Sequence, residues 1–95
     1  MLNKPINWNE EKNQLLKIQR DIDFEMVLEE IIADNILAIK SHPNKKKYAH
    51  QKIFVLEIKG YLCYVPFVEN DKEIFLKTII PSRKLKKEYE GAKDE

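Results

Sequence analysis

The spacing of apolar residues predicts two helices in the first third of the chain. One apolar face repeats every three to four residues, as one side of a helix does. Its members are Phe24, Val27, Leu28, Ile31 and Ile32. Asp23 is a suitable N-cap for it, so we expect a helix over 24–33. Asn9, followed by two glutamates that suit a first helical turn, predicts an earlier helix over 10–20.

Strand patterns follow in the second half of the chain. Stretches rich in β-branched and aromatic residues cover 51–59, 61–68 and 73–80. Lys59-Gly60 marks a hairpin between the first two, and 69–72 forms the next turn. The short apolar stretch 36–39 adds either another strand or a packed crossover. We therefore expect an antiparallel meander of three to four strands.

Two prolines modify this pattern. Pro66 lacks the N–H that a middle strand needs on both sides, so we expect a bulge or the loss of a partner there. Pro81 ends the third strand, and Ser82 is a suitable N-cap for a short helix that ends near Glu90. Together these elements predict one α+β domain over residues 1–95, with two N-terminal helices, the meander and a short C-terminal helix.

Charge is distributed unevenly, although the formal net charge of the 95 residues is only +1. Residues 1–39 carry eight acidic and four basic side chains. The windows 40–52 and 77–87 together carry ten of the seventeen basic residues and none of the sixteen acidic ones. If folding joins these windows, they form a basic face of the kind that attracts RNA or DNA.

The cysteine content and hydropathy narrow the class of protein. Cys63 is the single cysteine, so no disulfide framework or cysteine-based metal site can form within the chain. We expect a buried thiol in a reducing compartment. The sequence has no signal peptide and no apolar run long enough to span a membrane, which makes the cytoplasm the expected location.

Candidate chemistry centres on the end of the third predicted strand. Lys77, Arg83 and Lys84 surround the break at Pro81, and we expect them to lie close together as a phosphate site. The alternative is that the lysines only solvate their strand and helix. His42, beside the basic loop, is a candidate proton-transfer group, or simply a polar loop residue.

Aromatic residues interleaved with these cations are typical of surfaces that bind single-stranded RNA. Tyr48 and Tyr64 are the candidates to stack on bases, although tyrosines of a sheet are also commonly half-buried. No nucleotide-binding loop, nucleophile elbow or metal-ligand spacing is present. From the residues alone, we therefore expect a small α+β domain that binds a phosphate-rich partner.

Two segments resemble the BrnT family of toxins. They are Trp8-Asn9-Glu10-Glu11-Lys12-Asn13 with Asp23-Phe24-Glu25, and Lys77-Thr78-Ile79-Ile80-Pro81-Ser82-Arg83-Lys84. The resemblance implies a RelE-like fold and a ribonuclease toxin of a type II toxin–antitoxin system. Such a toxin uses no metal or other cofactor and is neutralised by a cognate antitoxin. Lys12, Ser82, Arg83 and Lys84 are the positions that the family motifs carry over.

The implied reaction is metal-independent cleavage of RNA, which inhibits translation. The ribose 2′-OH attacks the adjacent phosphate, Lys77 and Arg83 stabilise the charge that develops, and His42 or a tyrosine moves a proton. The expected RNA-binding residues are Lys12, Lys45, Lys46, Lys47, Tyr48, His50, Gln51, Tyr64, Ser82 and Lys84. The expected partners are RNA, on the ribosome or free, and the antitoxin, with a homodimer also compatible and no membrane partner.

Two other hypotheses remain open. The same basic face could bind RNA without cleaving it, or it could bind an acidic protein with no nucleic acid involved. Salt-dependent RNA binding without cleavage would select the first of these, and tight binding to an acidic protein without RNA affinity would select the second.

Overall fold

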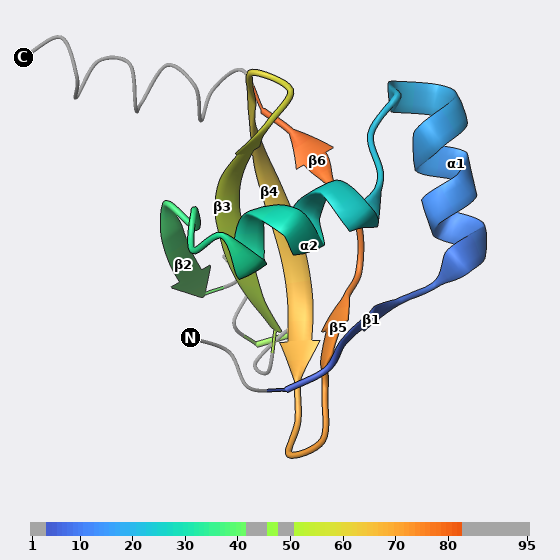
Figure 1. Ribbon diagram of the computed structural model, residues 1–95. Coiled ribbons are helices and arrows are strands. Elements are labelled where there is room, and N and C mark those ends of the chain that lie inside the picture. Colours follow the sequence, from blue (N-terminus) through green and yellow to red (C-terminus); the bar gives the residue numbers. More distant parts are fainter. Residues whose placement is uncertain (1–3, 42–45, 48–50, 83–95) are drawn as a thin grey trace, which may run out of the picture.

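The computed structural model describes residues 4–41, 46–47 and 51–82. In these residues the second helix lies across one face of a six-stranded sheet, and the first helix stands beside it at the edge of the sheet (Figure 1). The predicted α+β class therefore holds. The predicted antiparallel meander of three to four strands is wrong, because the sheet has more strands and mixes parallel with antiparallel pairing.

Both helices begin at the caps that the sequence predicts. In α1 (Glu10–Arg20), the Asn9 side chain accepts a hydrogen bond from the backbone N–H of Lys12. In α2 (Phe24–Ile32), the Asp23 side chain accepts one from Met26. Each cap satisfies a backbone donor that would otherwise lack a partner at the helix start.

A central hairpin organises the sheet. Strands β3 (Gln51–Ile58) and β4 (Tyr61–Glu69) pair antiparallel along their whole length. Lys59 and Gly60, with φ values of 53° and 82°, form the predicted tight turn between them. The short β2 (Ala38–Ser41), predicted as a strand or crossover near 36–39, pairs with the outer edge of β3.

The other side of β4 pairs with two short strands. β5 (Ile74–Leu76) and β6 (Ile80–Pro81) both run antiparallel to it, and they replace the continuous strand predicted over 73–80. Between the pairs Phe67↔Leu76 and Tyr64↔Ile80, β4 has two residues and the opposite segment has three. This extra residue is a β-bulge.

Pro66 explains the position of this bulge. Its carbonyl accepts a hydrogen bond of 2.8 Å from the N–H of Lys77, but its own nitrogen cannot donate one in return. The ladder is therefore interrupted beside Pro66, as the sequence predicts. The bulge also returns the Ile79 side chain to the core, where it is fully buried.

The parallel pairing comes from the start of the chain. Strand β1 (Ile6–Trp8) lies beside β5 with Ile6 opposite Ile74 and Trp8 opposite Leu76. It thereby forms one edge of the sheet, whose order is β1-β5-β4-β3-β2 with β6 also on β4. This three-residue strand therefore makes the sheet mixed.

The main hydrophobic core lies between the helices and one face of the sheet. Leu16 of α1 and Phe24, Val27 and Ile31 of α2 are buried there. On the sheet side, the Phe54 and Phe67 rings stack with centroids 3.9 Å apart. Burying one such aromatic side chain contributes about 2 to 3 kcal/mol relative to leaving it exposed.

The predicted C-terminal helix falls outside the described residues, apart from Ser82. The backbone N–H of Ser82 donates to the carbonyl of Leu62, so the chain is still paired with β4 at this point. Strand β6 ends at Pro81, the residue at which the sequence predicts the last strand to end. Two helices, α1 and α2, are present in the described part of the chain.

Candidate functional site

The sheet face opposite the helices carries the candidate site. We call it the open face because no helix of the described residues covers it (Figure 1). The register assigns to it residues of five strands, β2 to β6, and the bulge adds Lys77. Those used below are Lys40, Gln51, Ile53, Val55, Glu57, Leu62, Tyr64, Pro66, Val68, Phe75 and Ile80.

Two aromatic side chains and a cation lie in the middle of the open face. Tyr64 and Phe75 are half-buried, and Lys77 is exposed. The Lys77 Nζ lies 5.6 Å from the centroid of the Phe75 ring, within the range of a cation–π interaction. Tyr64 packs against the small apolar cluster of Val55 and Leu62. This arrangement places flat π surfaces beside a positive charge on a rigid strand pair.

The register also orders the other polar groups of this face. Lys40 lies opposite Ile53 on β2 and is exposed. Gln51, a predicted RNA-binding residue, lies opposite Val68 and is half-buried. Both belong to the side that carries Tyr64, so Lys40 adds a cation at the β2 edge of the open face.

Only part of the expected phosphate cluster lies within the described residues. Arg83 and Lys84 lie outside the described residues. Lys77 lies beside Pro66, whereas Ser82 lies beside Leu62, four residues away along β4. At the rise of an extended strand this separates the two backbones by about 13 Å. The described chain therefore does not bring Ser82 next to Lys77.

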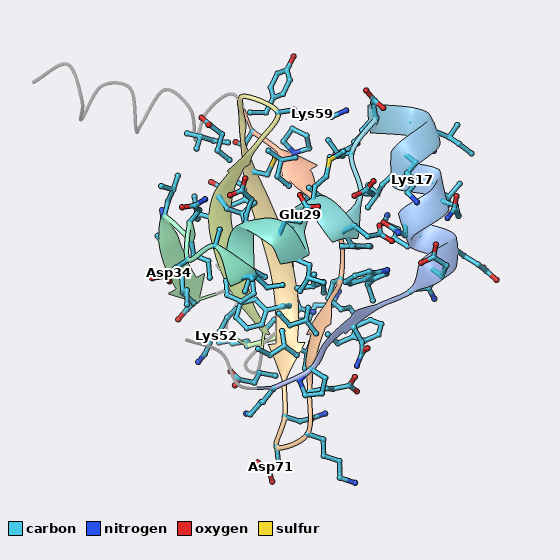
Figure 2. All side chains as sticks on the ribbon, viewed as in Figure 1. Lys17, Glu29, Asp34, Lys52, Lys59 and Asp71 are labelled. Carbon is cyan, nitrogen blue, oxygen red and sulfur yellow. The ribbon has the colours of Figure 1, made fainter. Side chains whose placement is uncertain are left out.

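The basic loop between β2 and β3 is described at two residues. Lys46 and Lys47, both predicted to bind RNA, are exposed there. Figure 2 shows Lys52, the next described cation, near the same end of the sheet as Asp71, while Lys59 lies at the opposite end. The candidates His42, Lys45, Tyr48 and His50 lie outside the described residues.

Lys12 lies away from the open face. It belongs to α1, whose buried Leu16 packs in the core on the helix side of the sheet. Its side chain is half-buried. The predicted RNA-binding role of Lys12 therefore requires a surface other than the one that carries Tyr64 and Lys77.

In the first segment that resembles the BrnT toxins, Trp8 and Asn13 connect the two helices through contacts with Phe24 and Glu25, and we call this set of contacts the clasp. The fully buried Asn13 accepts a 2.7 Å hydrogen bond from the N–H of Phe24 and donates a 2.8 Å bond to Glu25. The Trp8 ring stacks on Phe24 at a centroid distance of 5.7 Å. These residues hold α1 against the start of α2, a contact that we did not predict from the sequence.

Hydrogen bonds also perturb a carboxylate of this clasp. Gln14 and then Trp8 donate to Glu10 and hold its pKa below the ordinary value, because they stabilise the ionised form. Glu10 is exposed. It helps to orient Trp8 at the start of α1 and has no feature of a catalytic acid.

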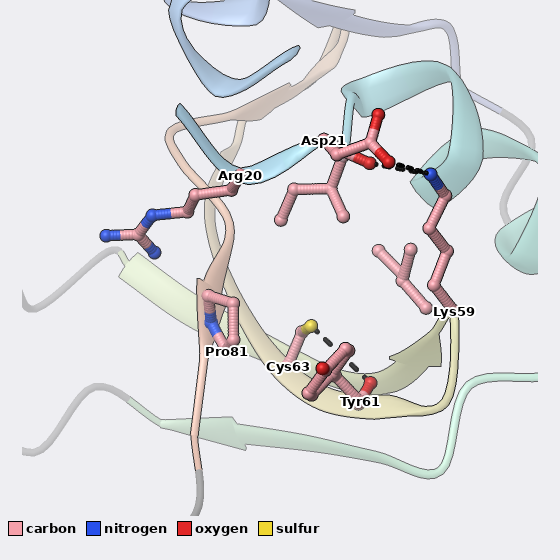
Figure 3. A pocket seen from close by; sticks show the side chains of 8 residues that line it. Arg20, Asp21, Lys59, Tyr61, Cys63 and Pro81 are labelled. Carbon is pink, nitrogen blue, oxygen red and sulfur yellow. Dashed lines mark hydrogen bonds and ion pairs between the residues drawn. The ribbon is translucent and has the colours of Figure 1, made fainter. Parts of the chain in front are cut away.

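A pocket of about 350 Å³ opens at the hairpin end of the sheet, between the end of α1 and strand β6. Figure 3 shows its lining. Buried apolar groups form the floor, and charged or aromatic groups form the rim. The lining residues are Arg20, Asp21, Ile22, Ile58, Lys59, Tyr61, Cys63 and Pro81.

The cations of the rim are held in different ways. Lys59 Nζ lies 2.9 Å from a carboxylate oxygen of Asp21 and 2.8 Å from its backbone carbonyl. The Arg20 guanidinium donates a 3.2 Å hydrogen bond to the carbonyl of Ile79. Sequence reasoning missed Arg20 because no local signal connects it to a carbonyl 59 residues further along the chain.

Cys63 forms part of the pocket floor as a neutral thiol. Burial raises its pKa from the ordinary 9.0 to about 11. Since the folded-state pKa is the higher one, this group favours the folded state below about pH 9, and that contribution is lost as the pH rises from 9 to 11. The thiol is therefore a poor nucleophile at neutral pH.

Alkylation should reveal this protection directly. At pH 8.5 we expect iodoacetamide to modify Cys63 of the native protein about a hundredfold more slowly than in urea, because the folded thiol is rarely ionised. Mass spectrometry reads one site, since the chain has a single cysteine. Equal rates in the two conditions would contradict a buried, protonated thiol.

The described residues contain neither a metal-binding cluster nor a membrane-spanning helix. In the described part of the chain, no group of three or more histidine, cysteine, aspartate or glutamate side chains is arranged to hold a metal ion. Neither α1 nor α2 has the length and apolar character that crossing a bilayer requires.

Comparison with known proteins leaves the family undecided. Neither protein-family models nor curated proteins nor solved structures give a match to the chain.

Proposed function

We propose that this protein is the toxin of a type II toxin–antitoxin system and that it cleaves RNA without a metal ion, with the RNA lying across the open face. The observation that carries this proposal is the placement of Tyr64, Phe75 and Lys77 on a sheet face that no described helix covers. Bare sheets with aromatic and cationic side chains bind single-stranded RNA by stacking and charge. The resemblance of two segments to the BrnT toxins supplies the reaction.

The proposed chemistry uses the RNA itself as the source of the nucleophile. A ribose 2′-OH attacks the adjacent phosphate, the bond to the 5′-oxygen of the next nucleotide breaks, and a 2′,3′-cyclic phosphate forms. The proton that the 2′-OH loses ends, overall, on the released 5′-oxygen. Lys77 offers its ammonium to the phosphoryl oxygens, where negative charge grows in the transition state. Tyr64 stacks on a neighbouring base and fixes the strand. The proposed roles of Arg83 and His42 concern residues beyond the described part of the chain.

A second candidate is a module that uses the same face to bind RNA without cleaving it. One observation favours it. Glu57, a carboxylate of the open face, lies opposite Leu62 and so about 13 Å along β4 from Pro66, beside which Lys77 lies. A base at that distance cannot reach the same phosphate as Lys77. For the toxin, we propose a cognate antitoxin as the protein partner.

An RNA cleavage assay in EDTA separates the two candidates. We expect the wild type to cut single-stranded RNA and Lys77→Ala to cut it about a hundredfold more slowly, the usual cost of losing one transition-state contact. Lys72→Ala is the matched control, because Lys72 is an exposed lysine in the turn before β5. Cells that express the wild type should stop growing, and cells that express Lys77→Ala should not.

The outcomes lead to different conclusions. RNA binding without cleavage, on free RNA and in a translating extract, would select the binding module. Cleavage that EDTA abolishes would contradict the metal-independent mechanism. Equal rates for Lys77→Ala and Lys72→Ala would remove Lys77 from the site.

A further inference from the structure

We propose that the pocket between Arg20 and Lys59 binds one nucleotide, with its base on the apolar floor and its phosphate on Arg20. The proposal rests on the proposed function for the class of ligand and on the geometry of the pocket for the location. A volume of about 350 Å³ lies at the lower end of the range for small-molecule sites. A single nucleotide is thus a ligand of suitable size for this pocket.

The floor of the pocket is suited to an apolar, flat group. Ile22, Ile58 and Cys63 are each less than 5% exposed, and Pro81 closes one side (Figure 3). The raised pKa of Cys63 keeps the thiol uncharged, so the floor repels neither a base nor a ribose. Tyr61, which is 60% exposed, supplies an aromatic surface at the rim on which a base can stack.

The rim carries one cation in excess. Asp21 and Lys59 form an ion pair and so neutralise each other. Arg20 remains, and its guanidinium makes a single hydrogen bond among the described residues, to the carbonyl of Ile79. A guanidinium has five N–H donors in a planar fork, which leaves donors for a phosphate. The bond to Ile79 fixes this cation at the side of the pocket that Pro81 forms.

The pocket and the open face, on which we propose that the RNA lies, are separated only by the short strand β6. Pro81 of β6 faces the pocket, and its neighbour Ile80 lies opposite Tyr64 on the open face. β6 is two residues long and pairs only with β4 within the described chain. A strand of RNA that crosses β6 can therefore place one nucleotide in the pocket and the next beside Tyr64.

Binding of adenosine 5′-monophosphate, adenosine and inorganic phosphate tests this inference by two-dimensional NMR of the labelled protein. We expect the monophosphate to shift the amide signals of Ile22, Ile58 and Cys63, and to bind at least tenfold more tightly than adenosine because of the charged contact. In Arg20→Gln this tenfold preference should disappear while the affinity for adenosine stays within about twofold. Lys17→Gln, the same charge change one turn earlier on α1, is the control.

Arg20→Lys provides a second variant if the glutamine variant folds poorly, and it should retain part of the preference for the phosphate. The inference is overturned if the monophosphate leaves these amides unchanged at millimolar concentration. It is also overturned if Arg20→Gln and Lys17→Gln weaken binding equally, which would indicate a general charge effect.

The same titration separates this inference from the proposed function. Occupation of the pocket by the monophosphate, in a protein that neither binds nor cleaves RNA, would support the nucleotide pocket and contradict the ribonuclease. Cleavage of RNA by a protein whose pocket ignores the monophosphate would overturn the pocket alone.

Discussion

Replacing Asn13 by alanine should lower the free energy of unfolding by about 3 kcal/mol, because one buried and one partly buried hydrogen bond are lost together. Asn13 is fully buried in α1. Its Oδ1 accepts from the N–H of Phe24 at 2.7 Å, and its Nδ2 donates to Glu25 at 2.8 Å. Alanine leaves the buried N–H of Phe24 without this partner and opens a small cavity.

Urea unfolding followed by circular dichroism measures this change. Gln14→Ala is the matched control on the same helix, because Gln14 is exposed and its bond to Glu10 lies in solvent. We expect the control to change the free energy of unfolding by less than about 0.5 kcal/mol. A loss below about 1 kcal/mol for Asn13→Ala would show that the clasp between α1 and α2 is not important for stability.

Asn13→Asp separates the two halves of the clasp. Aspartate keeps an acceptor for the Phe24 N–H but cannot donate to Glu25, and it adds a second negative charge beside that carboxylate. The variant should therefore be less stable than the wild type at pH 7 and should recover part of the difference as the pH falls and the new carboxyl becomes protonated.

The helices could be predicted because their signals are local. Asn9 and Asp23 cap the helices as their types suggest, and the buried Phe24, Val27 and Ile31 confirm most of the apolar stripe. Ile32 is 64% exposed, so the stripe is narrower than the spacing suggests. The burial of Asn13 could also have been predicted, because Asn13 lies three residues before Leu16 and therefore on the same, buried side of α1.

The sheet was harder to predict because its pairings are distant in sequence. Strand β1 has three residues and joins a partner 68 positions further along the chain, and no local pattern encodes that contact. Pro66 did indicate where the ladder breaks, since a missing N–H is a property of the residue itself. The sequence did not show which neighbour of β4 would lose a hydrogen bond at Pro66. The bond is lost on the side of β5 and β6, and the predicted continuous strand is therefore split into these two.

The candidate site was predictable in chemistry and less so in geometry. Basic windows and tyrosines pointed to Lys77 and Tyr64, and strand alternation places both on one face. The expected cluster at Pro81 assumed that the residues around it lie close together, whereas Lys77 and Ser82 lie beside residues of β4 that are four positions apart. Arg20 and its pocket depend on the contact with Ile79, which becomes apparent only in the folded chain.

RNA affinity should fall about a hundredfold when Tyr64→Leu and Lys77→Ala are combined. Leucine retains the apolar volume that packs on Val55 and Leu62 but removes the aromatic surface, and base stacking contributes about 1–3 kcal/mol per base. Removing Lys77 takes away one phosphate contact and the cation beside Phe75. The loss should be distributed over both changes, because stacking and charge act on neighbouring parts of the same RNA strand.

Fluorescence anisotropy with a labelled single-stranded RNA, measured at several salt concentrations, tests this prediction. Tyr64→Phe retains the ring and should bind like the wild type, whereas Lys77→Ala should reduce the slope of log affinity against log salt by about 0.7, the value for one phosphate on a single strand. Lys12→Ala, on the helix side, should leave both quantities unchanged. If Lys12→Ala weakens binding and the double variant does not, the RNA lies on the helix side of the protein and the open face serves another purpose.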